Sequence, residues 1–77
     1  MQENLTQNEQ IVVKVLSKMA SESGKARSED LLFIEVLKTH REFSSKQTEI
    51  REAIFSLIQK GIIIHDEKIP MWIRLNR

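Results

Sequence analysis

Apolar residues recur at helical spacing in three successive segments, and the first follows a polar capping sequence. Thr6-Gln7-Asn8-Glu9 has the Ser/Thr-x-x-Glu form of a capping box, in which hydroxyl and carboxylate satisfy free backbone N–H groups. The helix that follows is expected to end between Ala20 and Glu22, before a loop in which Gly24 can adopt a left-handed conformation. Its apolar face consists of Ile11, Val12, Val15, Leu16 and Met19.

A second helix is predicted to start after Ser28, a residue type that is favoured at the N-cap position. Glu29 and Asp30 follow, where the helix dipole favours negative charge. The segment LLFIEVL over 31–37 is apolar on almost every side. This pattern predicts a helix that is packed between two others.

A third helix is predicted from Ser44, taken as its N-cap, to about Lys60. Gln47 stands three residues after Ser44, as in a capping box, and Gly61 is expected to end the helix. The predicted buried face consists of Ile50, Ala53, Ile54, Leu57 and Ile58.

The pattern then changes to that of β-strands. The β-branched run at 62–64 predicts one strand and 71–75 a second, with a polar turn at 66–68. Pro70 stands at the start of the second strand, where a missing N–H does least harm. A short extra strand near 25–27 is expected to pair with this hairpin.

Three helices followed by a hairpin predict an α+β winged helix-turn-helix fold with a C-terminal two- or three-stranded β-wing. The chain of 77 residues has room for one modest core. We expect residues 1–7 to be a flexible N-terminus and residues 8–77 to be a single domain. The alternative is a three-helix bundle with a disordered tail, but the isoleucine run and Trp72 argue against it.

Composition argues against catalysis and against a bound cofactor or metal. The absence of cysteine excludes disulfides and Cys-type zinc sites, and two glycines are too few for a Gly-rich phosphate loop. His40 and His65 fall in different predicted elements, and the carboxylates are scattered. The chain is therefore expected not to be an enzyme. No apolar run is long enough to span a membrane, so we expect a cytoplasmic or nuclear location without membrane contact.

Charge gives a weak indication of where a partner binds. The formal net charge is +1. Six basic and seven acidic side chains stand before residue 44, whereas six basic and four acidic ones follow. The C-terminal part is therefore the better candidate for contact with an anion.

One edge of the third helix carries the strongest candidate site. Gln47, Arg51 and Phe55 stand at i, i+4 and i+8, beside the buried face, with Thr48 next to them. Arginine binds phosphate, and an aromatic ring stacks on a base or sugar. This edge is therefore a candidate nucleic-acid contact.

Both key residues also have structural interpretations. Arg51 could be a solvated charge that pairs with Glu52 or Glu49, and Phe55 could be an edge-of-core residue packed under Trp72. One aromatic at the rim could also touch core and ligand at once.

The stretch EIREAIFSLIQKG over 49–61, followed by IPMW over 69–72, resembles the Zα family of winged-helix domains, which bind left-handed Z-form DNA and RNA. The resemblance covers roughly residues 8–75. The positions that match the family pattern are Glu49, Ile50, Leu57, Lys60, Gly61, Pro70 and Trp72.

The resemblance implies recognition of nucleic-acid shape through the third helix and the wing. Arg51 stands where the family has an asparagine that contacts phosphate, and Phe55 where it has a tyrosine that packs against a syn base. Ile69 replaces the first wing proline, and Trp72 would support Phe55 from behind. The predicted nucleic-acid-binding residues are Lys46, Gln47, Thr48, Arg51, Phe55, Lys68, Ile69, Pro70 and Trp72.

By the same resemblance, the partner would be double-stranded DNA or RNA in Z form, bound by a monomer, with room for two copies on one duplex. A small chain that begins with Met1 is expected to be a viral protein that competes with host nucleic-acid sensors. One alternative is a winged-helix regulator that reads right-handed DNA through Gln47 and Arg51. The other is a protein-interaction winged helix of the cullin C-terminal type, which the low net charge favours.

Overall fold

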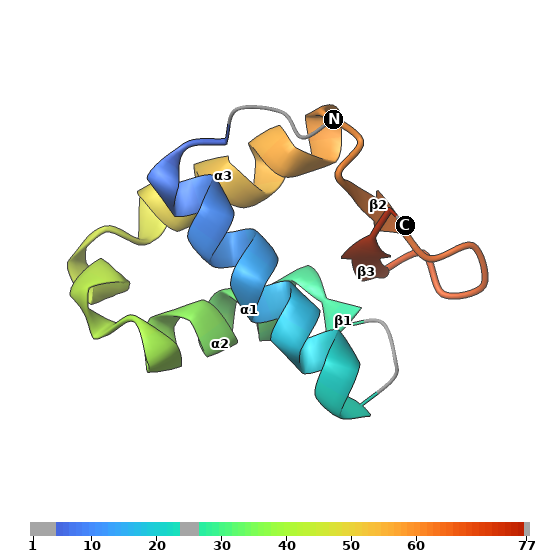
Figure 1. The fold of residues 1–77 in the computed structure, drawn as a ribbon, viewed down its shortest axis with the longest axis horizontal. Coiled ribbons are helices and arrows are strands. Elements are labelled where there is room, and N and C mark those ends of the chain that lie inside the picture. The colour runs from blue at the N-terminus through green and yellow to red at the C-terminus, as the bar shows by residue number, and fades with distance from the viewer. Residues whose placement is uncertain (1–4, 24–26, 77) are drawn as a thin grey trace.

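The computed structural model describes residues 5–23 and 27–76, in which helices precede a small antiparallel sheet (Figure 1). In the view of Figure 1, α2 and α3 lie on either side of α1, and the sheet lies beyond them near the C-terminus. The elements are α1 (Gln7–Ser23), β1 (Arg27–Ser28), α2 (Glu29–Thr39), the 3-10 helix η1 (Arg41–Ser45), α3 (Gln47–Gln59), β2 (Ile63–His65) and β3 (Trp72–Leu75).

The sheet has the strand order β1-β3-β2, and both pairings are antiparallel. In β1, Ser28 lies opposite Trp72, whereas Ile63 of β2 lies opposite Leu75. The predicted extra strand is confirmed at 27–28, and its first part, 25–26, lies outside the described residues. The chain therefore has the predicted α+β winged helix-turn-helix layout, with α2 and α3 as the helix pair and β2–β3 as the wing.

The predicted caps of the first two helices are confirmed. The Thr6 backbone N–H donates to Glu9 Oε1 at 2.9 Å, and the Glu9 N–H donates to Thr6 Oγ1 at 3.1 Å. At α2, Ser28 Oγ accepts from the Leu31 N–H at 3.2 Å. Helix α1 runs slightly further than expected, to Ser23, and the predicted cap residue Gly24 lies outside the described residues.

The predicted start of α3 was wrong. Ser44 belongs to η1, and α3 begins at Gln47 after Lys46, whose side chain makes no capping hydrogen bond. The Gln47 side-chain amide instead donates to the Ser44 carbonyl oxygen at 3.2 Å. Residues 41–45 wind into a 3-10 turn, so Ser44 stands two positions before Lys46, the N-cap residue of α3, and cannot cap the helix. The predicted end is confirmed, since Gly61 has a φ of 76°.

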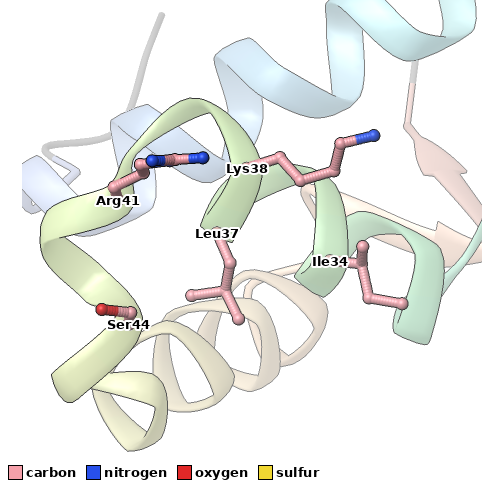
Figure 2. Close-up of a pocket in the computed structure, with 5 residues that line it drawn as sticks. All are labelled: Ile34, Leu37, Lys38, Arg41 and Ser44. Carbon is pink, nitrogen blue, oxygen red and sulfur yellow. The ribbon is translucent and has the colours of Figure 1, made fainter.

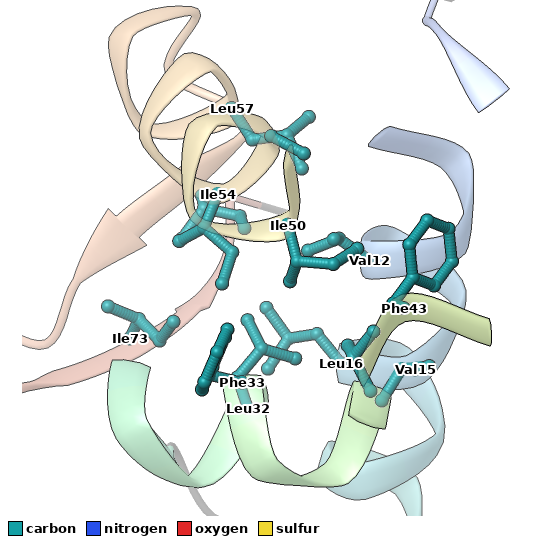
Figure 3. Packing of buried hydrophobic residues seen from close by; sticks show 13 residues of the cluster. Val12, Val15, Leu16, Leu32, Phe33, Phe43, Ile50, Ile54, Leu57 and Ile73 are labelled. Carbon is teal, nitrogen blue, oxygen red and sulfur yellow. The ribbon is translucent and has the colours of Figure 1, made fainter. Parts of the chain in front are cut away.

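The core is formed by the inner faces of all three helices and by the sheet (Figure 3). Of the predicted helix faces, Ile11, Met19 and Ile58 are only partly buried. The largest fully buried side chains are Leu16, Leu32, Ile50, Leu57, Ile63, Ile73, Val12 and Val36.

Helix α2 packs against both α1 and α3, as the sequence predicted, but part of its apolar surface stays exposed. Leu32, Phe33 and Val36 are buried, but Leu31 and Ile34 are 48% and 50% exposed. The η1 turn and β1 also pack against α2, yet Leu31 and Ile34 stay open to solvent. An apolar stripe is therefore left at the surface.

The strands are close to the predicted positions. Strand β2 is shifted by one residue to Ile63–His65, and β3 begins at Trp72, so Pro70 lies in the turn and not in the strand. Within 5–23 and 27–76, no helix has both the length and the apolar character to cross a bilayer.

Candidate nucleic-acid interface

The predicted edge of α3 lies at the surface. Gln47, Thr48, Arg51 and Phe55 are all exposed, as is Lys46 immediately before the helix. The opposite side of α3 buries its four core residues. The helix therefore separates an apolar inner face from a polar outer edge that carries one aromatic ring.

Phe55 is the most unusual residue of this edge, because it is 60% exposed. It belongs neither to the core cluster nor to the partly buried residues that pack against it. Among the described residues, the aromatic rings of His40 and Phe43 are in contact. No ring contact joins Phe55 to Trp72. The interpretation of Phe55 as a covered edge-of-core residue was therefore wrong, and its expected support by Trp72 is not a ring contact.

The position of Trp72 follows from the alternation of side chains along β3. Ile73 is buried in the core, so its neighbours Trp72 and Arg74 project from the opposite face of the sheet. Trp72 is partly buried there and lies opposite Ser28 of β1. It thus belongs to the face of the wing opposite the one that carries Ile73.

Arg51 stacks on an aromatic ring of α2. Its guanidinium carbon lies 4.1 Å from the ring centroid of Phe33, a buried residue. No ion pair joins Arg51 to Glu49 or Glu52, so the interpretation of Arg51 as a carboxylate partner was wrong. Stacking uses the flat face of the guanidinium and leaves N–H groups at its edge free to bind an anion.

The other flank of α3 is joined to α1 by a buried carboxylate that the sequence reasoning treated only as part of a cap. Glu9 is 2% exposed, and Ser56 Oγ donates to its Oε2 at 2.7 Å. Lys60 Nζ donates to both carboxylate oxygens at 3.1 and 3.0 Å. The Thr6 backbone N–H, followed by Ser56 and Lys60, lowers the pKa of Glu9 from 4.5 to about 2.

Helix α3 is thus held from two sides. Glu9 attaches it to α1, and Arg51 attaches it to α2 through Phe33. A weaker link joins the Asn8 side-chain amide to Glu49 Oε1 at 3.3 Å. These contacts fix the orientation of the exposed edge without covering it.

The turn of the wing is organised by Asp66 and His65. Asp66 Oδ1 accepts from the backbone N–H groups of Ile69 at 3.1 Å and Lys68 at 2.8 Å, and these bonds lower the pKa of Asp66. His65 Nδ1 lies 2.8 Å from the Pro70 carbonyl oxygen, to which it donates, because a carbonyl only accepts. Lys68, Ile69 and Pro70 are consequently held in an exposed turn.

The predicted site residues therefore form two groups and not one connected cluster. Lys46, Gln47, Thr48, Arg51 and Phe55 share the edge of α3, whereas Lys68, Ile69 and Pro70 form the wing turn. No hydrogen bond or ring contact joins the two groups. Trp72 lies on the outer face of β3 and has no ring contact with Phe55.

One residue near these groups was missed, and another was considered only as an ion-pair partner of Arg51. Arg74 shares the outer face of β3 with Trp72, and strand alternation in the sequence is the signal that would have found it. Glu52 is an exposed carboxylate one position from Arg51, and it reduces the positive potential of the α3 edge.

Metal coordination finds no support in the described ranges, where no cluster of three or more His, Asp or Glu side chains is arranged to hold an ion. Comparisons with family models, curated proteins and solved structures gave no match to this chain.

Proposed function

We propose that this protein binds double-stranded DNA or RNA in the left-handed Z form, by shape, through the edge of α3 and the wing turn. The observation that carries the proposal is the exposure of Phe55, at 60%, on the same helix edge as Gln47 and Arg51. An aromatic ring in water beside a cation and an amide is suited to a ligand that has both flat bases and phosphates.

The phosphate contacts come from the start of α3. Lys46 and Arg51 supply positive charge, and Gln47 and Thr48 supply neutral hydrogen-bond donors. Arg51 is held by Phe33, so its guanidinium loses little additional freedom when it binds a phosphate. These residues stand along one helix edge, as a row of phosphates requires.

The base contact comes from Phe55. A Z-form helix exposes base faces that a right-handed duplex stacks inside, and a phenyl ring packs against such a face without reading base identity. Because Phe55 lacks a hydroxyl, it adds no hydrogen bond to phosphate.

The wing turn contributes the remaining contacts. Lys68 reaches phosphate, while Ile69 and Pro70 pack against the sugar–phosphate backbone. Trp72 contributes through the outer face of the wing, without a ring contact to Phe55. Since the protein stabilises a rare form of the duplex, it shifts the conformational equilibrium toward that form. Such a ligand would be met in the cytoplasm or the nucleus.

Circular dichroism of an alternating CG duplex tests the proposal. Excess protein should invert the long-wavelength band of the duplex, which reports the change of helix hand. Binding of a right-handed duplex without inversion would replace the proposal with a transcriptional-regulator function. Absence of any nucleic-acid binding at low salt would leave the protein-interaction alternative.

Two variants make the titration specific. Arg51→Ala removes one positive charge from the α3 edge, and Lys18→Ala removes one from the exposed surface of α1. The first should weaken the inversion, and the second should leave it unchanged. Equal effects of the two would indicate non-specific attraction by charge alone.

A further inference from the structure

An open groove of about 440 Å³ lies along α2 and η1, and no residue of the proposed nucleic-acid surface lines it (Figure 2). Figure 2 shows the charged ends of Lys38 and Arg41 on one side, with the side chains of Leu37 and Ile34 on the other. The groove is lined by Ile34, Leu37, Lys38, Arg41 and Ser44.

The apolar part of this groove belongs to the face of α2 that the fold leaves uncovered. Ile34 is 50% exposed, and Leu31, one turn earlier, is 48% exposed. Leu37 is partly buried and forms the transition to the core. From Leu31 to Leu37 the helical rise corresponds to an apolar stripe of about 9 Å, close to two turns of a short helix lying alongside.

The rim of the groove is positively charged. Lys38 and Arg41 are exposed, and neither has an ion-pair partner among the residues that the structure describes. No carboxylate lines the groove, and Ser44 adds only a neutral hydroxyl. The combination of an apolar floor and unpaired cations favours an occupant that carries both apolar side chains and carboxylates.

We propose that this groove docks a short, acidic, amphipathic helix from a partner protein. Its apolar side chains lie against Leu31, Ile34 and Leu37, and its carboxylates face Lys38 and Arg41. A nucleic acid would satisfy the cations but leave the apolar floor unfilled. A second copy of this chain, docked through the same face, would bring its own Lys38 and Arg41 against these two cations.

The groove and the proposed nucleic-acid surface use different side chains, and a hydrogen bond, from the Gln47 amide to the Ser44 carbonyl oxygen, joins them. The groove residues belong to α2 and η1, whereas Lys46, Gln47, Thr48, Arg51 and Phe55 belong to the edge of α3. The protein can therefore hold a duplex and an acidic helix together. The small size of the groove predicts a weak, transient contact with the partner helix.

The test uses a fluorescein-labelled peptide of about 14 residues, three to four helical turns, with leucines on one face and glutamates on the other. Fluorescence anisotropy should show saturable binding. Two matched peptides, one with lysine for every glutamate and one with serine for every leucine, should bind roughly tenfold more weakly or not at all. Backbone amide shifts in an NMR titration should change along α2 and η1.

Variants of the protein locate the contact. Ile34→Ser and the double variant Lys38→Glu, Arg41→Glu should each weaken binding of the glutamate peptide roughly tenfold. Lys14→Glu, a charge reversal at an exposed site on α1, should not. All these side chains are exposed, and a thermal melt checks that each variant is folded.

Four results would overturn the proposal. They are no saturable binding, equal binding of the lysine peptide, amide shifts confined to the edge of α3, and a dimer in light scattering that Ile34→Ser dissociates. The double variant should still invert the dichroism of the CG duplex. If the wild-type chain binds the peptide but does not invert the duplex, the nucleic-acid proposal alone fails.

Discussion

Arg51 and Phe55 stand one turn apart on α3 but are in different physical states. The guanidinium of Arg51 rests on the Phe33 ring at 4.1 Å, whereas Phe55 presents its ring to solvent. Arg51 therefore contributes to the contact between α2 and α3 as well as to a ligand site. Phe55 makes no comparable contribution to the fold, so the two residues respond differently to substitution.

Replacing Phe55 with alanine should separate binding from folding. The free energy of unfolding should change by no more than about 0.5 kcal/mol, because the ring is already exposed. Binding of a Z-form duplex should weaken by about 1–3 kcal/mol, the usual contribution of one base–aromatic stack. Urea denaturation and a binding titration measure the two quantities. A large loss of stability, with unchanged affinity per folded molecule, would place Phe55 in the core.

The contact of Arg51 with Phe33 can be measured by a double-mutant cycle in urea denaturation. The variants are Arg51→Ala, Phe33→Leu and their combination, since leucine keeps an apolar side chain but removes the ring face. A coupling energy of about 0.5–1 kcal/mol is expected for a cation–π contact at an exposed site. Additive effects of the two substitutions would show that the stacking contributes nothing to the fold.

At the scale of elements, α3 is held between α1 and α2, and the wing turn is closed by its own side chains. The link to α1 depends on one buried carboxylate, that of Glu9, and three kinds of donor reach it. A buried charge is stable only when such partners are present. The free energy of unfolding should therefore depend on the ionisation of Glu9, and hence on pH.

The lowered pKa of Glu9 predicts a specific loss of stability in acid. The pKa is about 2 in the folded chain and near 4.5 when Glu9 is unpaired, so its contribution is complete above pH 4.5 and is lost as the pH falls toward 2. The shift corresponds to about 3 kcal/mol at neutral pH. Urea denaturation at a series of pH values measures it.

Glu9→Gln should remove that part of the pH dependence and lower stability at pH 7. Glu67→Gln, at an exposed position in the wing turn, is the matched control and should change neither. If both variants lose as much folding stability in acid as the wild-type chain does, the Glu9 carboxylate is not the source of that loss.

The elements that the sequence predicted well are those set by local patterns. The helix stripes, the Thr6–Glu9 box, the Ser28 cap and the Gly61 stop all depend on residues within a turn or two of one another. The wrong start of α3 arose from η1, a 3-10 turn with no periodic signal of its own.

The parts of the candidate site that could not be predicted depend on tertiary packing. Ser56 and Lys60 reach Glu9 across 47 and 51 positions of sequence. The stacking of Arg51 on Phe33 requires the approach of α2 to α3, and the side of the sheet that Trp72 occupies requires the register of β3. The exposure of the α3 edge could be predicted from helical periodicity alone. The contacts that its side chains make with other elements could not.

At the scale of the whole molecule, the net charge of +1 limits how strongly a polyanion is attracted. The proposed interface has three cations, Lys46, Arg51 and Lys68, against exposed carboxylates at Glu52 and Glu67. Affinity must therefore come from fitted contacts as well as from released counterions.

The salt dependence of duplex binding follows from this small number of cations. The slope of log K against log salt should be no steeper than about −3, since each neutralised phosphate contributes about −0.9. Arg51→Ala should reduce the magnitude of the slope by about 1, and Lys18→Ala should leave it unchanged. Fluorescence anisotropy at several salt concentrations measures both, and a slope unaffected by Arg51→Ala would show that Arg51 does not contact phosphate.

The most direct test compares two duplexes of the same alternating CG sequence and length. One carries guanines brominated at C8, which favours the syn conformation and the left-handed helix, and the other is unmodified and right-handed. A protein shifts a conformational equilibrium only through its differential affinity for the two forms. Fluorescence anisotropy should show at least roughly tenfold tighter binding to the left-handed duplex, and Phe55→Ala should remove most of this preference. Equal affinity for the two duplexes, or tighter binding of the right-handed one, would contradict recognition of the Z form.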